Sequence, residues 1–197
     1  MITGVVLAAG MSTRMGRPKL LLPLGGTVVL QHVLDAAAAA PLDEIVVVLG
    51  PQTADVADEV RLPEAGRLVM NAQAAVGQST SLRCGLEAAV PESEAAVVLL
   101  GDQPEVRADA VAAVVAAFRD TPAAVVQAAY SGVPAHPTVL AREVWPEVVA
   151  GGRDEGARAW IRRHPGARRL VEVGGTPPAD IDTRADYELV RERMERA

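Results

Sequence analysis

Short runs of aliphatic residues alternate with segments of helical periodicity along the whole chain of 197 residues. Several runs, such as 45–49 and 95–100, are apolar throughout rather than at every second position. Continuous apolar runs of this length are typical of parallel strands that helices cover on both faces. We therefore predict an α/β fold of three layers with a mostly parallel central sheet. The expected strands are 4–8, 44–49, 67–70, 95–100, 124–130 and 169–173, and the expected helices are 28–40, 53–60, 79–90, 108–119, 142–149, 155–163 and 184–195.

The composition excludes several classes of protein. Half of the residues are hydrophobic but only 3% are aromatic, so the core must be built from Ala, Val, Leu and Ile. A net charge of −6 argues against a protein that wraps nucleic acid. No stretch approaches the ~20 apolar residues of a transmembrane helix, and the start of the chain lacks the features of a signal peptide. The single Cys84 suits a reducing compartment. We expect one cytoplasmic domain, 1–197, that binds neither nucleic acid nor membrane.

Polar residues follow three of the expected strands. They occupy 10–19, 101–104 and 180–183. Because ligands of open parallel sheets bind at the carboxyl ends of the strands, we expect these segments to meet at one edge. Residues 131–138 contain Gly132, Pro134 and Pro137, and we expect an ordered loop there.

The segment 10–19 combines two glycines with a serine, a threonine, two arginines and a lysine. Glycine lets backbone N–H groups approach a polyphosphate, and Arg14 and Lys19 supply positive charge. Five residues separate Gly10 from Gly16, and Ser12 stands where a dinucleotide motif has glycine, so the Walker and G-x-G-x-x-G patterns both fail. The segment predicts a phosphate-binding loop of another kind, the alternative being a surface loop with solvated cations.

Residues 7–20, LAAGMSTRMGRPKL, resemble the signature LAAGxSxRMGxxK of the nucleotidyltransferases similar to the molybdenum-cofactor cytidylyl- and guanylyltransferases. The resemblance implies a Rossmann-like nucleotidyltransferase fold in which 1–105 mainly bind the NTP and 106–197 mainly bind the acceptor. It also implies that Arg14, Lys19 and Asp102 are catalytic. The nucleotide contacts that it implies in this segment are Leu7, Ala8, Ala9, Gly10, Ser12, Arg14 and Lys19. With Ala9, the chain has the LAAG form of the cytidylyl members, whereas guanylyl members usually carry LAGG.

Asp102 follows an aliphatic strand, where a carboxylate is costly unless it meets a cation. Mg²⁺ fits beside a nucleotide because it takes one or two carboxylates plus phosphate oxygens; the alternative is a cap for the next helix. Thr183 and Asp186 have the spacing of a capping box. The resemblance implies that Asp102 and Asp182 together ligate magnesium, with Asp180 as a neighbour.

Two further segments match the family. Residues 77–82, GQSTSL, match a G-x-S-x-S-L stretch that opens a helix and lines the base pocket, which with Asp102 adds the nucleotide contacts Asn71, Gln78, Ser79 and Ser81. Ser79 has the alternative of capping that helix. His136 and Pro137 match a G-H-P-V-L-like segment on the acceptor side, although Ala135 and Thr138 replace its glycine and valine.

Arg158 ends the stretch GRDEGAR at 152–158, which resembles the family's G-x-x-G-A-R element with one additional residue between the glycines, so the resemblance implies that it binds the acceptor. The alternative for this arginine-rich stretch is a solvated face. The implied function is Mg²⁺-dependent transfer of CMP from CTP to the phosphate of molybdopterin or molybdenum cofactor, with release of pyrophosphate and a possible molybdoenzyme receiving the product. An ionised acceptor phosphate needs no general base, so positioning and charge stabilisation suffice. The alternatives are a GTP-dependent or sugar- or alcohol-phosphate nucleotidyltransferase and a non-catalytic cofactor-delivery protein.

Overall fold

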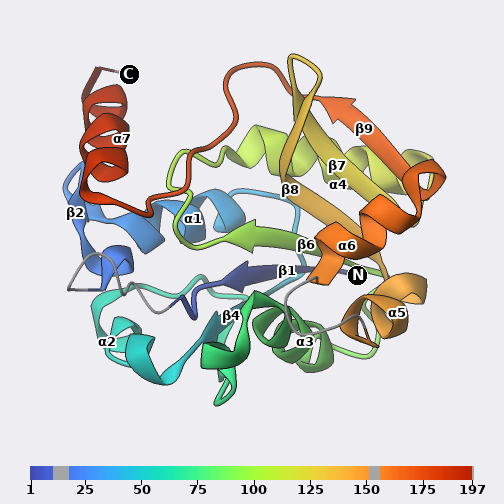
Figure 1. Cartoon of the computed structure of the whole chain (residues 1–197), viewed down its shortest axis with the longest axis horizontal. Helices are drawn as coiled ribbons and strands as arrows, with labels where there is room; N and C mark the ends of the chain where they lie inside the picture. The colour runs from blue at the N-terminus through green and yellow to red at the C-terminus, as the bar shows by residue number, and fades with distance from the viewer. Residues whose placement is uncertain (11–17, 151–155, 197) are drawn as a thin grey trace.

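A seven-stranded sheet lies between two layers of helices in the computed structural model, which describes residues 1–10, 18–150 and 156–196 (Figure 1). Helices α1 and α4 cover one face of the sheet, and α3, α5 and α6 cover the other. The helices are α1 (Val29–Ala38), α2 (Val56–Glu59), α3 (Gln78–Ala88), α4 (Ala108–Asp120), α5 (Trp145–Ala150), α6 (Gly156–Arg163) and α7 (Arg184–Arg196). The predicted three-layer fold is confirmed. No helix in these ranges is long and apolar enough to cross a membrane.

The strands of the main sheet lie in the order β5-β4-β1-β6-β8-β7-β9. Strand β8 is antiparallel to both of its neighbours, whereas the other adjacent pairs are parallel. The strands are β1 (Ile2–Leu7), β4 (Glu44–Leu49), β5 (Gly66–Met70), β6 (Ala95–Leu100), β7 (Val125–Tyr130), β8 (Val133–Ala141) and β9 (Arg168–Glu172). The prediction of a mostly parallel sheet is therefore confirmed.

Strand β8 corrects the prediction of a loop at 131–138. Ser131 and Gly132 have φ of 52° and 80° and form the tight turn of a hairpin between β7 and β8. The register shifts between Gln127 and Ala128, so that Gln127 pairs with Thr138 while Ala128 pairs with Ala135. Pro137 lies in this bulge, where proline's missing N–H leaves no ladder hydrogen bond unmade. Proline therefore marked an irregularity within a strand rather than a loop.

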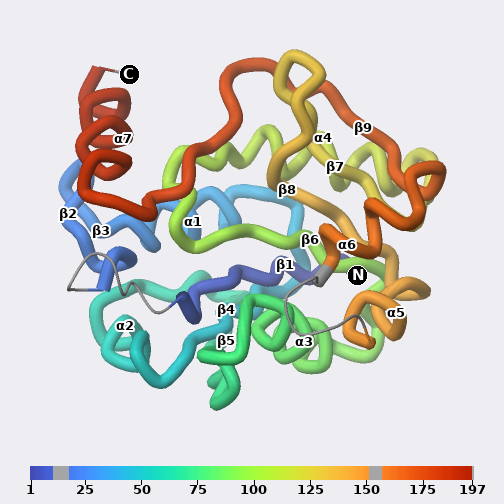
Figure 2. The backbone as a smooth tube through the Cα atoms, viewed as in Figure 1, coloured from blue at the N-terminus to red at the C-terminus, as the bar shows by residue number. Residues whose placement is uncertain are grey.

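The C-terminal helix α7 packs away from the main sheet, against the hairpin of β2 (Pro23–Leu24) and β3 (Thr27–Val28) (Figure 2). The buried residues of this contact are Leu22, Leu24, Val29, Ile181, Tyr187 and Val190. The Tyr187 hydroxyl also donates a hydrogen bond to the carbonyl oxygen of Pro23. This packing carries the segment before α7 to the short 3-10 helix η1 (Lys19–Leu21).

Candidate active site

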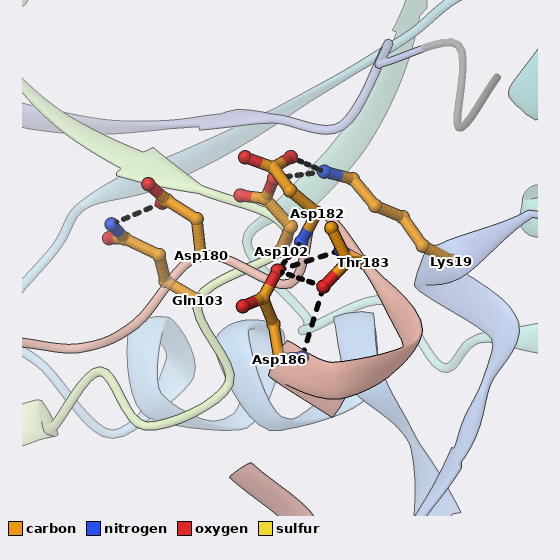
Figure 3. A network of polar contacts seen from close by, with 7 residues as sticks. All are labelled: Lys19, Asp102, Gln103, Asp180, Asp182, Thr183 and Asp186. Atoms are coloured by element: carbon orange, nitrogen blue, oxygen red, sulfur yellow. Dashed lines mark hydrogen bonds and ion pairs between the residues drawn. The ribbon is translucent and has the colours of Figure 1, made fainter. Parts of the chain in front are cut away.

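Lys19 joins the three polar segments at the carboxyl edge of the sheet. Its Nζ donates to Asp102 Oδ2 at 2.5 Å and to Asp182 Oδ1 at 2.9 Å (Figure 3). Asp102 follows β6, and Asp182 immediately precedes the cap of α7. The structure thus brings together side chains that are 83 and 163 residues apart in the sequence.

Burial and mutual attraction both shift the pKa values in the cluster of Lys19, Asp102 and Asp182. Burial raises the pKa of Asp102 above its ordinary value, although the ammonium of Lys19 opposes the shift. For Lys19, burial alone would lower the pKa, but the two carboxylates outweigh it and the pKa lies above its usual value. Lys19 therefore remains protonated at neutral pH and offsets one of the two carboxylate charges.

The donor set fits a divalent cation. The carboxylates of Asp102 and Asp182 converge on one positive charge, and Mg²⁺ commonly takes one or two carboxylates together with phosphate oxygens. Over the described ranges, no group of three or more His, Cys, Asp or Glu residues is placed to hold a metal ion. A cation held here would thus draw its remaining ligands from substrate and water. The alternative that Asp102 caps the next helix is wrong, because Arg107 is the N-cap of α4.

The predicted capping box at the start of α7 is confirmed. Asp186 Oδ2 accepts hydrogen bonds from the Thr183 amide at 2.7 Å and the Asp182 amide at 3.2 Å, while the Asp186 amide donates to Thr183 Oγ1 at 3.2 Å. These bonds fix the backbone of Asp182, whose carboxylate bonds Lys19. Asp180 accepts from Gln103 Nε2 at 2.8 Å rather than from Lys19, and its charge adds to the raised pKa of the neighbouring Asp102 (Figure 3).

Two cavities open beside the cluster. The smaller, of about 130 Å³, is lined by Leu7, Ala8, Ala9, Gly10, Lys19, Leu20, Ala74, Gln78, Ser81 and Asp102. The larger, of about 490 Å³, is lined by Leu7, Gln78, Ser79, Leu82, Val98, Leu100, Gln127, Pro134, Ala135, His136, Thr138, Ala157, Arg158, Ile161, Arg162 and Arg168. Leu7 and Gln78 line both, so the two cavities adjoin.

The smaller cavity gathers most of the described residues that the sequence assigns to the nucleotide. Asn71 is not in the wall of this cavity. Its Nδ2 donates to Thr80 Oγ1 at 2.9 Å and to Ser81 Oγ at 3.0 Å, so it contacts the cavity residue Ser81. Ser79 lines the larger cavity instead. The alternative that Ser79 caps α3 is wrong, because the N-cap is Gly77, with φ of 146°.

The larger cavity has a basic lining. Arg158, Arg162 and Arg168 line it, and none of its described lining residues is Asp or Glu. His136 Nδ1 lies 3.2 Å from the carbonyl oxygen of Val98. Because a carbonyl only accepts, Nδ1 carries a proton; burial lowers the pKa of His136, so the ring is neutral and Nε2 is an acceptor. This cavity is suited to an anionic ligand.

Some of the predicted site residues lie outside the described residues or away from the two cavities, and other lining residues were not predicted. Ser12, Arg14 and residues 152–155 lie outside the described residues, and Pro137 is not in either cavity wall. Sequence reasoning missed Gln127 and placed Arg168 only within the arginine-rich stretch; both line the larger cavity. The signal for Gln127 was a lone polar residue within the otherwise apolar strand 125–129.

Comparisons with known proteins place the chain in a family. The family model of the MobA-like NTP transferase domain matches residues 4–169. The nicotine blue oxidoreductase of Paenarthrobacter nicotinovorans is 31% identical, over 92% of this chain and 92% of that protein. The purine catabolism protein PucB of Bacillus subtilis is also 31% identical, over 98% of this chain and 97% of that protein.

Solved structures agree with this result. The homologue of Mycobacterium tuberculosis Rv0371c from Mycobacterium sp. strain JC1 has a TM-score of 0.85 at 33% identity, covering 99% of this chain and 97% of that chain. Rv0371c in complex with manganese has a TM-score of 0.79 at 31% identity, covering 97% and 98%, and supports divalent-metal binding in this family. A nucleotidyl transferase from Methanothermobacter thermautotroptrophicus has a TM-score of 0.77 at 25% identity, covering 100% and 98%.

The family model covers most of the chain, and the relatives above 30% identity align along nearly all of it. The structure places a lysine, two carboxylates and two adjoining cavities at one edge of the sheet, as a nucleotide-binding site requires. The chain is a nucleotidyltransferase of the MobA-like NTP transferase family.

Proposed function

We propose that the protein transfers CMP from CTP to the phosphate of molybdopterin or molybdenum cofactor and releases pyrophosphate. The observation that carries this proposal is the convergence of Asp102 and Asp182 on Lys19 beside the smaller cavity. One relative is named an oxidoreductase. The choice of group transfer therefore rests on this charge arrangement, which suits a polyphosphate and its metal, rather than on family membership alone.

The smaller cavity would hold the nucleotide. Lys19 supplies positive charge to the triphosphate, together with Arg14 of the same segment. Gln78 and Ser81 offer donors and acceptors to the edge of a base, and Asn71 fixes Ser81 through a 3.0 Å hydrogen bond. The methyl group of Ala9, in the wall of this cavity, restricts a purine more than a pyrimidine. These contacts support CTP as the nucleotide.

Asp102 and Asp182 would hold Mg²⁺, which supplies charge stabilisation to the phosphates. The larger cavity would hold the acceptor, with Arg158 and His136 beside it and its phosphate directed toward the smaller cavity. An acceptor phosphate oxygen then forms a bond to the α-phosphorus of CTP, and the bond to pyrophosphate breaks in line with it. Residues 1–105 would then mainly bind the nucleotide and 106–197 mainly the acceptor. The exceptions are Asp182, on the metal side, and the residues of 1–105 that line the larger cavity, which are Leu7, Gln78, Ser79, Leu82, Val98 and Leu100. A molybdoenzyme would receive the product.

The test is pyrophosphate release with Mg²⁺ and each of the four NTPs, with and without molybdopterin. The proposal predicts release that needs both CTP and molybdopterin. Release with GTP, or with a sugar or alcohol phosphate in place of molybdopterin, would favour the alternative transferases. Binding of CTP and cofactor without any release would favour a delivery protein.

Asp102→Asn should abolish the release while leaving the protein folded. Asp109→Asn is the matched control, because the Asp109 side chain is 72% exposed and pairs with Arg107 rather than with the cluster. A fully active Asp102→Asn variant would contradict the metal assignment.

A further inference from the structure

Thr138 is a buried polar residue that takes no part in the proposed contacts with the nucleotide and the phosphates. It lines the larger cavity and is 2% exposed. Its Oγ1 is buried and has no hydrogen-bond partner within the described part of the chain. A buried hydroxyl without a partner costs free energy, so its presence in a cavity wall points to a partner supplied by a ligand.

Two polar side chains lie beside Thr138 in the same cavity wall. Gln127 is its register partner across β7 and β8, and Arg168 Nη1 of β9 donates to Gln127 Oε1 at 3.3 Å. This bond occupies the amide oxygen of Gln127 and leaves its Nε2 as a donor. We call Gln127, Thr138 and Arg168 the polar floor; all three line the larger cavity.

The polar floor extends along the cavity wall from Thr138 on β8, the strand next to β6, to Arg168 on the edge strand β9. The cavity crosses the sheet from Leu7 of β1, which it shares with the smaller cavity, to Arg168 of β9. Strands in a sheet are about 4.8 Å apart. The distance from β6, the strand that leads to Asp102, is therefore about 5 Å to Thr138 on β8, about 10 Å to Gln127 on β7 and about 14 Å to Arg168 on β9.

Between the two ends, Leu82, Val98, Leu100 and Ile161 give the wall an apolar part. A ligand that spans it must combine an anionic end, an apolar or flat body, and a hydrogen-bonding end at this separation. A phosphate alone, or a phosphate on a very short carrier, leaves the polar floor unused.

We propose that the polar floor binds the far ring edge of the acceptor, and that this edge carries a carbonyl group next to an N–H group. Gln127 Nε2 and the Arg168 guanidinium donate to the carbonyl oxygen, and the Thr138 hydroxyl oxygen accepts from the N–H. A cyclic amide in a pterin ring has this edge, so the proposal rests on the proposed function and deepens it by assigning residues that select the acceptor. The polar floor acts on acceptor binding and does not contact the nucleotide.

The test uses Thr138→Val, which removes the hydroxyl at nearly constant shape, and Thr138→Ser, which keeps it. The probe is a phosphate ester of hydroxymethylpterin, titrated against the full chain and followed by pterin fluorescence. We expect Thr138→Val to weaken probe binding about tenfold, as for the loss of one hydrogen bond. Thr138→Ser should bind like the wild type, and Thr121→Val at an exposed position is the control.

Two further readouts separate recognition from a structural role. The KM for molybdopterin should rise in Thr138→Val while the KM for CTP stays unchanged. The thermal unfolding midpoint of Thr138→Val should be unchanged or raised, because the change removes an unpaired buried hydroxyl. A lowered midpoint with unchanged probe binding would overturn the proposal, and so would a wild type that fails to bind the probe.

The outcomes also distinguish this proposal from the proposed function. Probe binding that depends on Thr138, without pyrophosphate release from CTP and molybdopterin, would contradict the function and support the polar floor. Release in the wild type with unchanged binding and KM in Thr138→Val would support the function and contradict the polar floor.

Discussion

Gly85→Ala tests how closely α3 must lie on the sheet for its first turn to reach the site. Gly85 faces β1 and β4, and an added Cβ would overlap Val5 Cγ1 and lie 3.0 Å from Val48 Cγ2. Both valines are 0% exposed and belong to the core under α3. The overlap can therefore be relieved only by moving the helix or the strands.

Two opposing terms set the magnitude. Alanine is about 1 kcal/mol better than glycine in a helix interior, while overpacking a close-packed core costs about 1–3 kcal/mol. Because the overlap is with two buried β-branched side chains, we expect the upper part of this cost and a net loss of about 1–2 kcal/mol of unfolding free energy. This corresponds to a fall in Tm of about 2–8 °C for a domain of this size.

Equilibrium urea denaturation measures the stability change, and the KM for CTP measures its effect on the site. Moving α3 displaces Gln78 and Ser81, which line the smaller cavity, so the KM should rise. Val5→Ala removes the overlapping methyl, and the double variant Val5→Ala/Gly85→Ala should recover at least about 0.5 kcal/mol relative to additivity. A Gly85→Ala variant that is more stable than the wild type, with unchanged KM, would refute this reasoning.

Three further predictions concern the site and the cap of α7. Lys19→Met leaves Asp102 without its counter-ion, so the unfolding free energy should fall by about 2 kcal/mol in urea denaturation. The KM for CTP, measured by pyrophosphate release, should rise. Wild-type values of both quantities would contradict the role of Lys19 as the counter-ion of Asp102. Ala9→Gly should relax the preference for CTP over GTP in competition assays, and an unchanged ratio would remove the steric account. The Thr183 hydroxyl and backbone amides lower the pKa of Asp186 below its ordinary 3.8, so the stabilisation is present above that pH and is lost as the pH falls through the folded-state pKa. Asp186→Asn should therefore cost about 0.5–1 kcal/mol at pH 7 and progressively less below pH 3.8 in urea denaturation; a difference independent of pH would contradict this.

The sequence predicted the fold where the hydrophobic pattern is continuous. Strands 44–49 and 95–100 match β4 and β6 at both ends, because the apolar runs 45–49 and 95–100 are continuous and polar residues or turns bound them. The capping box was predictable because it is a local pattern with one geometry. Strand β8 was missed because it contains two prolines: Pro137 lies in the bulge and Pro134 pairs with Ala129, placements that depend on the partner strand.

The sequence predicted which residues form the site better than it predicted the contacts between them. The polar segments after the strands indicated Lys19, Asp102 and Asp182, but the sharing of one ammonium by two carboxylates depends on the packing of α7 against the β2–β3 hairpin. The polar floor was invisible for the same reason, since Gln127, Thr138 and Arg168 become neighbours only through the strand order.

Single-turnover pyrophosphate release from CTP, with molybdopterin and a titration of Mg²⁺, tests the central claim most directly. The claim is that Asp102 and Asp182 hold the metal beside Lys19 for nucleotidyl transfer. The wild type should release pyrophosphate with a saturable dependence on Mg²⁺, while Asp102→Asn should lose release at every Mg²⁺ concentration and Asp182→Asn should need more Mg²⁺. Wild-type rates and Mg²⁺ dependence in both folded variants would contradict the account.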